Sequence, residues 1–165
     1  MKLTADYFIT HLAMEEHIEG GYFKEIYQHA QTIESACADS TDVRCLSSTI
    51  YYLLRSQQVS KFHQLTSDEL WFFHTGSPLL IHLIDSEGRL RTETLGLDAG
   101  SGQSPQIRVP AYTIFGAEVA ADDSFTFVSC MVSPGFDYRD FRLFTSEELI
   151  RQFSQHQAII TRLNG

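Results

Sequence analysis

The residues best suited to chemistry lie in one stretch of the chain, 61–76, which combines a histidine, a carboxylate and several large aromatic side chains. A strand that begins near Glu69 places Glu69, Trp71 and Phe73 on one face, because successive side chains of a strand point to opposite sides. If that face lines the inside of a barrel, Glu69 is a partly desolvated acid, and desolvation raises the pKa of a carboxyl group. Such a group can act as an acid, a base or a ligand.

His63 precedes this strand and is close enough in sequence to reach the same mouth of a barrel. A histidine and a glutamate that converge in an apolar pocket are typical of both metal sites and acid–base pairs. In the alternative interpretation, His63 caps a turn and Glu69 pairs with a neighbouring Lys or Arg. Periodicity alone favours neither. His74 falls on the opposite face from Glu69, which excludes it as a pocket ligand.

Three more side chains are candidates for the same pocket or its walls. Tyr51 belongs to a strongly β-like run and either presents its hydroxyl to the pocket or is a core tyrosine with a backbone partner. Glu25 follows a Gly-Gly turn and either pairs with a pocket cation or sits at the solvated rim. Cys130 lies in the middle of an apolar strand, which predicts a buried structural thiol rather than a nucleophile.

Most of the chain is predicted to form short strands, with helices only near the two ends. The predicted strands are 22–29, 46–54, 69–74, 79–85, 89–95, 106–109, 112–119 and 125–132, the segment 31–44 is predicted to be a loop, and helices are predicted at 3–14 and from a capping box at 145–148 to about residue 154. Terminal helices do not fit the alternating pattern of a parallel α/β sheet. The order of elements therefore favours an all-β jelly roll.

Composition and charge limit the classes of function. The chain has 165 residues, 43% hydrophobic and 20% charged, which predicts a single domain, 1–165. The net charge of −9 and the lack of a Lys/Arg cluster argue against a nucleic-acid partner. Apolar runs are only strand-sized and no signal peptide is recognisable, so we expect no membrane contact. Three cysteines without a C-x-x-C pair indicate free thiols in a reducing compartment, which predicts a cytoplasmic protein.

The spacing from His63 through Glu69 to Gly76 resembles the first motif of the cupin superfamily, H-x-H-x(3,4)-E-x(6)-G. A second cupin motif, P-x-G-x(2)-H-x(3)-N, aligns weakly with the run that ends at Phe115. Leu65 and Phe115 stand where two of the usual metal-binding histidines would be, and neither side chain has a lone pair to donate. The resemblance therefore predicts no cofactor, and leaves His63 and Glu69 as the ligands of any weakly bound divalent metal.

A closer resemblance is to a group of small cupins of unknown function with a barrel like that of dTDP-sugar epimerases. It covers roughly residues 3–150 and rests on the runs 17–25, 48–54, 60–71, 95–96, 105–110 and 130–141. The chain departs from the group at Ile18, where proline is usual, and at Tyr112, where glycine is usual. The resemblance implies a cupin jelly-roll barrel with short N- and C-terminal helices, a small-molecule pocket in the barrel and a homodimer.

We therefore expect a pocket for a small polar ligand, sugar-like or nucleotide-like, at the mouth of the barrel. The expected catalytic residues are His63 and Glu69, and the expected ligand-binding residues are Tyr51, Trp71, Phe115 and Glu25. In the first hypothesis, His63 and Glu69 act as the acid–base pair of a metal-independent epimerase or isomerase. The alternatives are a divalent-metal-dependent enzyme and a binding or sensor module without catalysis, because one fold hosts many functions.

Overall fold

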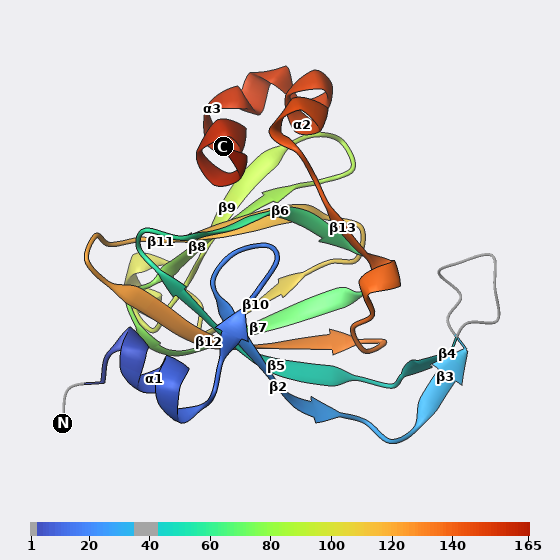
Figure 1. Ribbon diagram of the computed structural model, residues 1–165. Coiled ribbons are helices and arrows are strands. Elements are labelled where there is room, and N and C mark those ends of the chain that lie inside the picture. The colour runs from blue at the N-terminus through green and yellow to red at the C-terminus, as the bar shows by residue number, and fades with distance from the viewer. Residues whose placement is uncertain (1–2, 35–42) are drawn as a thin grey trace.

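The computed structural model describes residues 3–34 and 43–165, and two antiparallel sheets that face each other form the body of the fold (Figure 1). The first sheet contains, in spatial order, β1 (Glu15–Glu16), β2 (Tyr22–Gln28), β5 (Ser48–Arg55), β12 (Phe125–Ser133), β7 (Asp68–Gly76) and β10 (Gln106–Val109). The second contains β13 (Phe141–Leu143), β6 (Val59–Leu65), β11 (Ile114–Val119), β8 (Leu79–Ile84) and β9 (Leu90–Leu95). The predicted all-β jelly roll is confirmed.

A main hydrophobic core fills the space between the two sheets. It includes Tyr52 of β5 and Trp71 of β7 from the first sheet, and Ile81 of β8 and Phe115 of β11 from the second. These side chains are almost completely buried. Trp71 packs edge-on against both Tyr52 and Phe115, with ring centroids 5.7 and 6.3 Å apart. Edge-to-face contacts of this kind add to the stabilisation from burial, so the rings join the two sheets.

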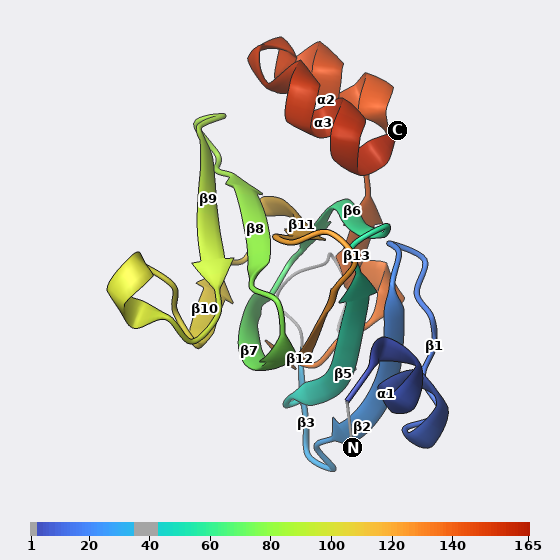
Figure 2. The ribbon, with the colours of Figure 1, turned by 90° about the vertical axis from the view of Figure 1, so that its left-hand side faces the viewer.

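Three helices cover the outside of the barrel, as the turned view shows (Figure 2). Helix α1 (Ala5–His11) begins at the N-cap Thr4 and packs against the outer face of β5 and β12. Helices α2 (Ser146–Gln152) and α3 (Gln157–Asn164) cover the second sheet. Within the described ranges, no helix is long and apolar enough to cross a bilayer.

The predicted ends of the chain need two corrections. The helix predicted to end near residue 154 is not the last one. A 3-10 turn at Ser154–His156 leads directly into a further helix, α3. Sequence signals missed α3 because its first residue has no side-chain cap. The N-terminal helix, in contrast, ends at His11 rather than at residue 14.

The segment predicted to be a loop, 31–44, contains two short paired strands, β3 (Thr32–Glu34) and β4 (Val43–Cys45). Residues 35–42, which include Cys37, lie outside the described residues. A further unpredicted strand is β6, whose central position in the second sheet places His63 inside the barrel. Polar and charged residues interrupt the apolar ones in all three strands, so a pattern search for runs of aromatic and β-branched side chains missed them.

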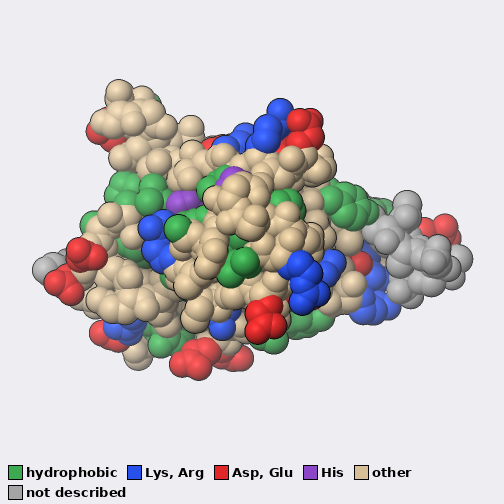
Figure 3. Space-filling view, turned by 90° about the horizontal axis from the view of Figure 1, so that it is seen from above, with side chains coloured by type: hydrophobic (Ala, Val, Ile, Leu, Met, Phe, Trp, Pro, Cys, Tyr) green, Lys and Arg blue, Asp and Glu red, His purple; other side chains and the backbone are tan. Residues whose placement is uncertain are grey.

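Charged side chains of both signs are interspersed on the face of the molecule seen from above (Figure 3). Arg89, for example, pairs with Asp85 and Glu87, and Arg162 pairs with Glu118. Exposed pairs of this kind contribute about 0–1 kcal/mol each to stability. The barrel is therefore held together mainly by its core and not by its surface charges.

The turn between β1 and β2 depends on Gly20. Its φ is +113°, and a Cβ atom placed there would lie 2.0 Å from the carbonyl oxygen of Val59. Its own carbonyl accepts a hydrogen bond of 2.7 Å from the Tyr52 hydroxyl. Only glycine combines this backbone conformation with so close an approach to β6.

We predict that Gly20→Ala lowers the free energy of unfolding by roughly 2–4 kcal/mol, because the added methyl group clashes with a backbone oxygen. Urea denaturation measures the change. Gly102→Ala is the matched control, since Gly102 also has positive φ, +81°, but no atom lies within 4 Å of its Cβ position. The control should lose about 1 kcal/mol from backbone strain alone. Equal losses in the two variants would contradict the prediction.

Candidate functional site

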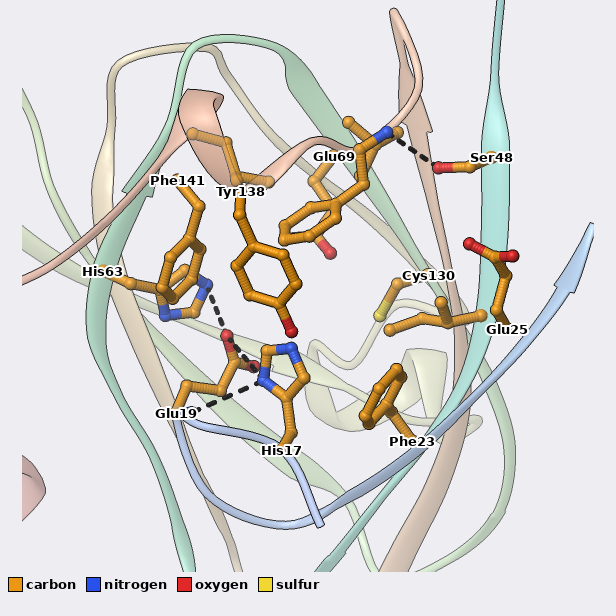
Figure 4. A pocket seen from close by; sticks show the side chains of 14 residues that line it. His17, Glu19, Phe23, Glu25, Ser48, His63, Glu69, Cys130, Tyr138 and Phe141 are labelled. Atoms are coloured by element: carbon orange, nitrogen blue, oxygen red, sulfur yellow. Dashed lines mark hydrogen bonds and ion pairs between the residues drawn. The ribbon is translucent and has the colours of Figure 1, made fainter. Parts of the chain in front are cut away.

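A cavity of about 140 Å³ lies between the two sheets, beside the segment that leads into β13 (Figure 4). A cavity of this size holds about one six-membered ring. It is lined by His17, Glu19, Phe23, Glu25, Ser48, Ile50, His63, Leu65, Glu69, Cys130, Val132, Phe136, Tyr138 and Phe141. These residues come from both sheets and from the turn before β2, so the site forms only when the barrel closes.

His63 projects from β6 into this cavity and is only 2% exposed. Its Nδ1 lies 2.7 Å from the carbonyl oxygen of Lys61, and a carbonyl can only accept, so Nδ1 carries a hydrogen atom. Its Nε2 lies 3.3 Å from Oε2 of Glu19. The imidazole of His63 and the carboxyl group of Glu19 therefore face each other inside the cavity, and the backbone fixes the orientation of the ring.

Glu19 reaches this position from the turn between β1 and β2. The hydroxyl of Ser60 donates a hydrogen bond of 3.0 Å to its Oε1. The backbone N–H of Lys61 donates a hydrogen bond of 2.8 Å to its carbonyl oxygen. Both bonds come from β6, the strand that carries His63. The carboxyl group and the imidazole are thus positioned by a single strand.

His17 forms the other side of the Glu19 carboxyl group, with Nδ1 3.5 Å from Oε2. The backbone N–H of Glu19 donates to the same Nδ1 at 3.4 Å, which leaves the ring hydrogen on Nε2. Burial lowers the pKa of His17, the Glu19 charge raises it in part, and His63 lowers it further. His17 is therefore neutral near pH 7, and its ring packs edge-on against Phe23.

Glu69 reaches the cavity from β7 and is 6% exposed (Figure 4). Its Oε2 has no hydrogen-bond partner among the described residues. Burial raises the pKa of Glu69 to about 8, and the nearby charge of Glu19 adds to the rise, while Trp71 and Cys130 offset part of it. At neutral pH, Glu69 is therefore mostly a neutral carboxylic acid that can donate a proton or a hydrogen bond.

Two other weakly acidic groups near the cavity keep their protons. Burial, and next the charge of Glu69, raise the pKa of the Cys130 thiol well above its ordinary value. Burial, and next the charge of Glu19, raise the pKa of the Tyr52 hydroxyl. Cys130 is 2% exposed, so the predicted buried thiol is confirmed, and a thiol is a weak nucleophile.

Of the six residues predicted for the site, three line the cavity: His63, Glu69 and Glu25. The predicted pairing is different, because the carboxyl group beside His63 belongs to Glu19. Phe115 and Trp71 lie behind the walls in the core, where both are 1% exposed. Phe115 still bears on the site, because its ring packs against that of His63 with centroids 4.1 Å apart.

The prediction that Tyr51 faces the pocket is wrong. Ile50 and Tyr52 point into the barrel, so their neighbour Tyr51 points outward. There its ring packs beside Phe127 and His74, in the cluster beneath α1. His74 hydrogen-bonds to a serine of β12 on this outer face, which confirms its exclusion from the pocket.

The aromatic rim of the cavity was not predicted. Phe136, Tyr138 and Phe141 belong to a segment that returns across the mouth after β12. Their sequence signal was the run 130–141, which had served only to support the family resemblance. The run 17–25 likewise contained His17 and Glu19 without marking them as site residues. A search limited to the neighbourhood of Glu69 could find neither segment, because the fold brings them together from a distance.

The donor atoms present do not fit a tightly bound divalent metal. The described residues contain no group of three or more His, Cys, Asp or Glu side chains placed to hold one. Both ring nitrogens of His63 are already engaged, by Lys61 and by Glu19. Leu65, which stands at a usual histidine position, presents only carbon atoms to the cavity. Metal sites in proteins usually need three or more converging ligands.

Two facing antiparallel sheets that enclose a small cavity define a cupin-type jelly-roll barrel. The chain belongs to the Cupin superfamily (DUF985) family, whose model matches residues 6–144. The resemblance seen in the sequence is thereby confirmed. A protein of Saccharomyces cerevisiae described as uncharacterised is 26% identical over 147 residues, which make up 82% of this chain and 73% of the yeast protein.

Solved structures are similar over nearly the whole chain. A crystal structure of a protein from Shewanella oneidensis has 44% identity, covers 99% of both chains and superposes with a TM-score of 0.88. A hypothetical protein from Leishmania major has 36% identity, covers 97% of this chain and 98% of its own, and has a TM-score of 0.89. A point mutant of Bacillus subtilis oxalate decarboxylase shares only 10% identity over 90% of this chain and 36% of its own, with a TM-score of 0.55, and this likeness shows the fold alone.

We predict that Glu69→Gln makes the protein more stable at pH 8 and that the gain shrinks toward pH 5. The folded state keeps the Glu69 proton up to a pKa of about 8, whereas the unfolded chain releases it near the ordinary value of 4.5. Between these values the unfolded state binds fewer protons, so wild-type stability falls as pH rises, by at most about 1.4 kcal/mol per pH unit. Urea unfolding at several pH values measures it. The role of burial would be refuted if the gain in stability from Glu69→Gln did not change with pH. It would also be refuted if Glu87→Gln, at an exposed position, gave the same gain in stability.

Proposed function

We propose that the cavity binds a small polar ligand of about one ring and that the protein acts on it as a metal-independent isomerase or epimerase. One observation carries the proposal: the His63–Glu19 pair and the neutral acid Glu69 line the same cavity. Two titratable groups whose environments hold them in opposite roles are the usual arrangement for acid–base catalysis at neutral pH.

The chemistry that suits these groups begins at a carbon atom next to a carbonyl. The His63–Glu19 pair takes the proton from that carbon, and the electron pair of the broken C–H bond moves into a carbon–carbon double bond. The carbonyl oxygen takes the proton of Glu69. Return of the first proton to the other face of the same carbon gives the epimer, and the enol hydroxyl returns its proton to Glu69. If that carbon carries a hydroxyl group, return of the first proton to the former carbonyl carbon moves the carbonyl group instead, and that hydroxyl group gives its proton to Glu69. No electrons are gained or lost overall.

The walls of the cavity support this chemistry. Phe23, Phe136 and Phe141 line the cavity together with the polar groups. Excluding water strengthens the hydrogen bonds between a ligand and the buried carboxyl groups. The carbonyl oxygen of Lys61 orients His63 in the way that a third group orients the base in other acid–base sites.

We predict that the protein catalyses exchange of a carbon-bound hydrogen of its ligand with solvent deuterium. Free sugars, sugar phosphates, nucleotide-linked sugars and polyols are incubated with the protein in D₂O, and mass spectrometry records the incorporated deuterium. His63→Gln should lower the exchange rate by about a hundredfold or more, because general acid–base catalysis contributes at least that much.

His11→Gln is the matched control, because His11 lies on exposed α1 and outside the cavity. It should exchange deuterium at the wild-type rate. Ligand binding without any exchange would reject the isomerase and leave a binding protein. Exchange that persists in His63→Gln would reject the assigned base.

A further inference from the structure

The lining of the cavity has an unusual balance of charge. The titratable side chains in the described lining are three carboxyl groups, two imidazoles, one thiol and one phenol: Glu19, Glu25, Glu69, His17, His63, Cys130 and Tyr138. No Lys or Arg side chain of the described residues belongs to it. Phosphate and carboxylate groups are normally held in proteins by Arg, by Lys or by clusters of backbone N–H groups. The cavity therefore lacks the donors that an anionic ligand requires.

The polar groups inside the cavity already balance one another. Nε2 of His63 lies 3.3 Å from the carboxyl group of Glu19, and burial lowers the pKa of His17. Glu69 is buried with one oxygen free of partners and supplies no positive charge. An anion placed here would lose its water without gaining a Lys or Arg partner, and it would lie beside the carboxyl groups of Glu19 and Glu69. Burying a charge without an opposite charge is costly, so an uncharged ligand is favoured over an anionic one.

The entrance to the cavity also disfavours anionic ligands. The Glu25 carboxylate stands at the edge of the cavity, and its only described hydrogen bond comes from the Gln28 amide, at 2.9 Å (Figure 4). Lys24, its neighbour on β2, does not line the cavity. A phosphate or nucleotide attached to a ligand would have to pass, or remain beside, the negative charge of Glu25. The chain as a whole carries a net charge of −9, which acts in the same direction.

The remaining lining suits a ring that is apolar on its faces and polar at its edge. Phe23, Phe136 and Phe141 offer flat aromatic surfaces to such a ring. Ser48 and the unpartnered Glu69 oxygen offer hydrogen bonds at its edge. Aromatic rings that stack on the C–H faces of a sugar, with a few polar groups for its hydroxyls, form this kind of surface.

We infer that the cavity selects an uncharged polyhydroxy carbonyl compound of about one ring, that is, a free sugar, over its phosphorylated, nucleotide-linked and acidic forms. The inference rests on the proposed function, because it names the substrate class of the same site. It assigns Glu25 as a residue that determines specificity at the mouth, by repelling anions.

The test uses glucose, mannose and galactose as probes, each compared with its 6-phosphate and its uronate by calorimetric or NMR titration. At least one neutral sugar should bind about tenfold or more tightly than its two anionic forms. Glu25→Lys should lower the ratio of the anionic to the neutral dissociation constant by about tenfold, because it replaces a negative charge at the mouth by a positive one. Glu87→Lys makes the same charge change on an exposed turn outside the cavity and should leave this ratio unchanged.

An anionic sugar that binds wild-type protein as tightly as its neutral form would overturn the inference. It would fail equally if Glu25→Lys and Glu87→Lys behaved alike, or if none of the neutral probes bound. If a sugar phosphate or a nucleotide-linked sugar exchanged deuterium, and His63→Gln abolished that exchange, the inference about substrate class would be wrong. The proposed isomerase function would still be supported. Failure of every compound to bind or exchange would reject both.

Discussion

The site depends on one buried contact, in which the carboxyl group of Glu19 meets the imidazole of His63. Burying two titratable groups is costly unless each has partners, and here Ser60 and the backbone of Lys61 provide them. All of these partners lie on β6, so their hydrogen bonds fix the position of the turn before β2 relative to that strand. Gly20 makes the position possible, because only a residue without a side chain can approach the Val59 carbonyl so closely. The turn at Gly20 thus sets both the path of the backbone and the position of the Glu19 carboxyl group beside His63.

The fold could be predicted because its signals are local. Strand-length apolar runs, turn residues and a capping box each act over a few positions, and the burial of Glu69 and Trp71 followed from alternation along one strand. Tyr51 shows where alternation stops being informative. β5 is covered on both faces, by the core and by α1, so Tyr52 and Leu53 are equally buried and equally apolar in sequence. When both faces are buried, the sequence pattern cannot tell which one faces a cavity.

The pairing within the site could not be predicted, because it joins residues far apart in the chain. His63 and Glu69 are separated by six positions and invited assignment as a pair, but Glu19 is 44 positions from His63 and lies in an irregular turn. The resemblance to cupins identified the family correctly. It also drew attention to the positions where metal ligands are absent, Leu65 and Phe115, although the acid–base groups of this cavity came from elsewhere. A family match therefore located the cavity better than it located the groups inside it.

The C-terminal helices α2 and α3 lie beyond the part of the chain that the family model matches, and α3 contacts the strand that carries His63. Asn164 accepts a hydrogen bond from the backbone N–H of Phe62 and donates one to the carbonyl of Phe144. Phe62 packs among the helices on one face of β6 while His63 faces the cavity on the other. The C-terminal end of α3 is therefore tied to the strand that carries His63. The position of α3 therefore limits how far the His63 imidazole can move. A displacement of α3 would displace His63 within the cavity.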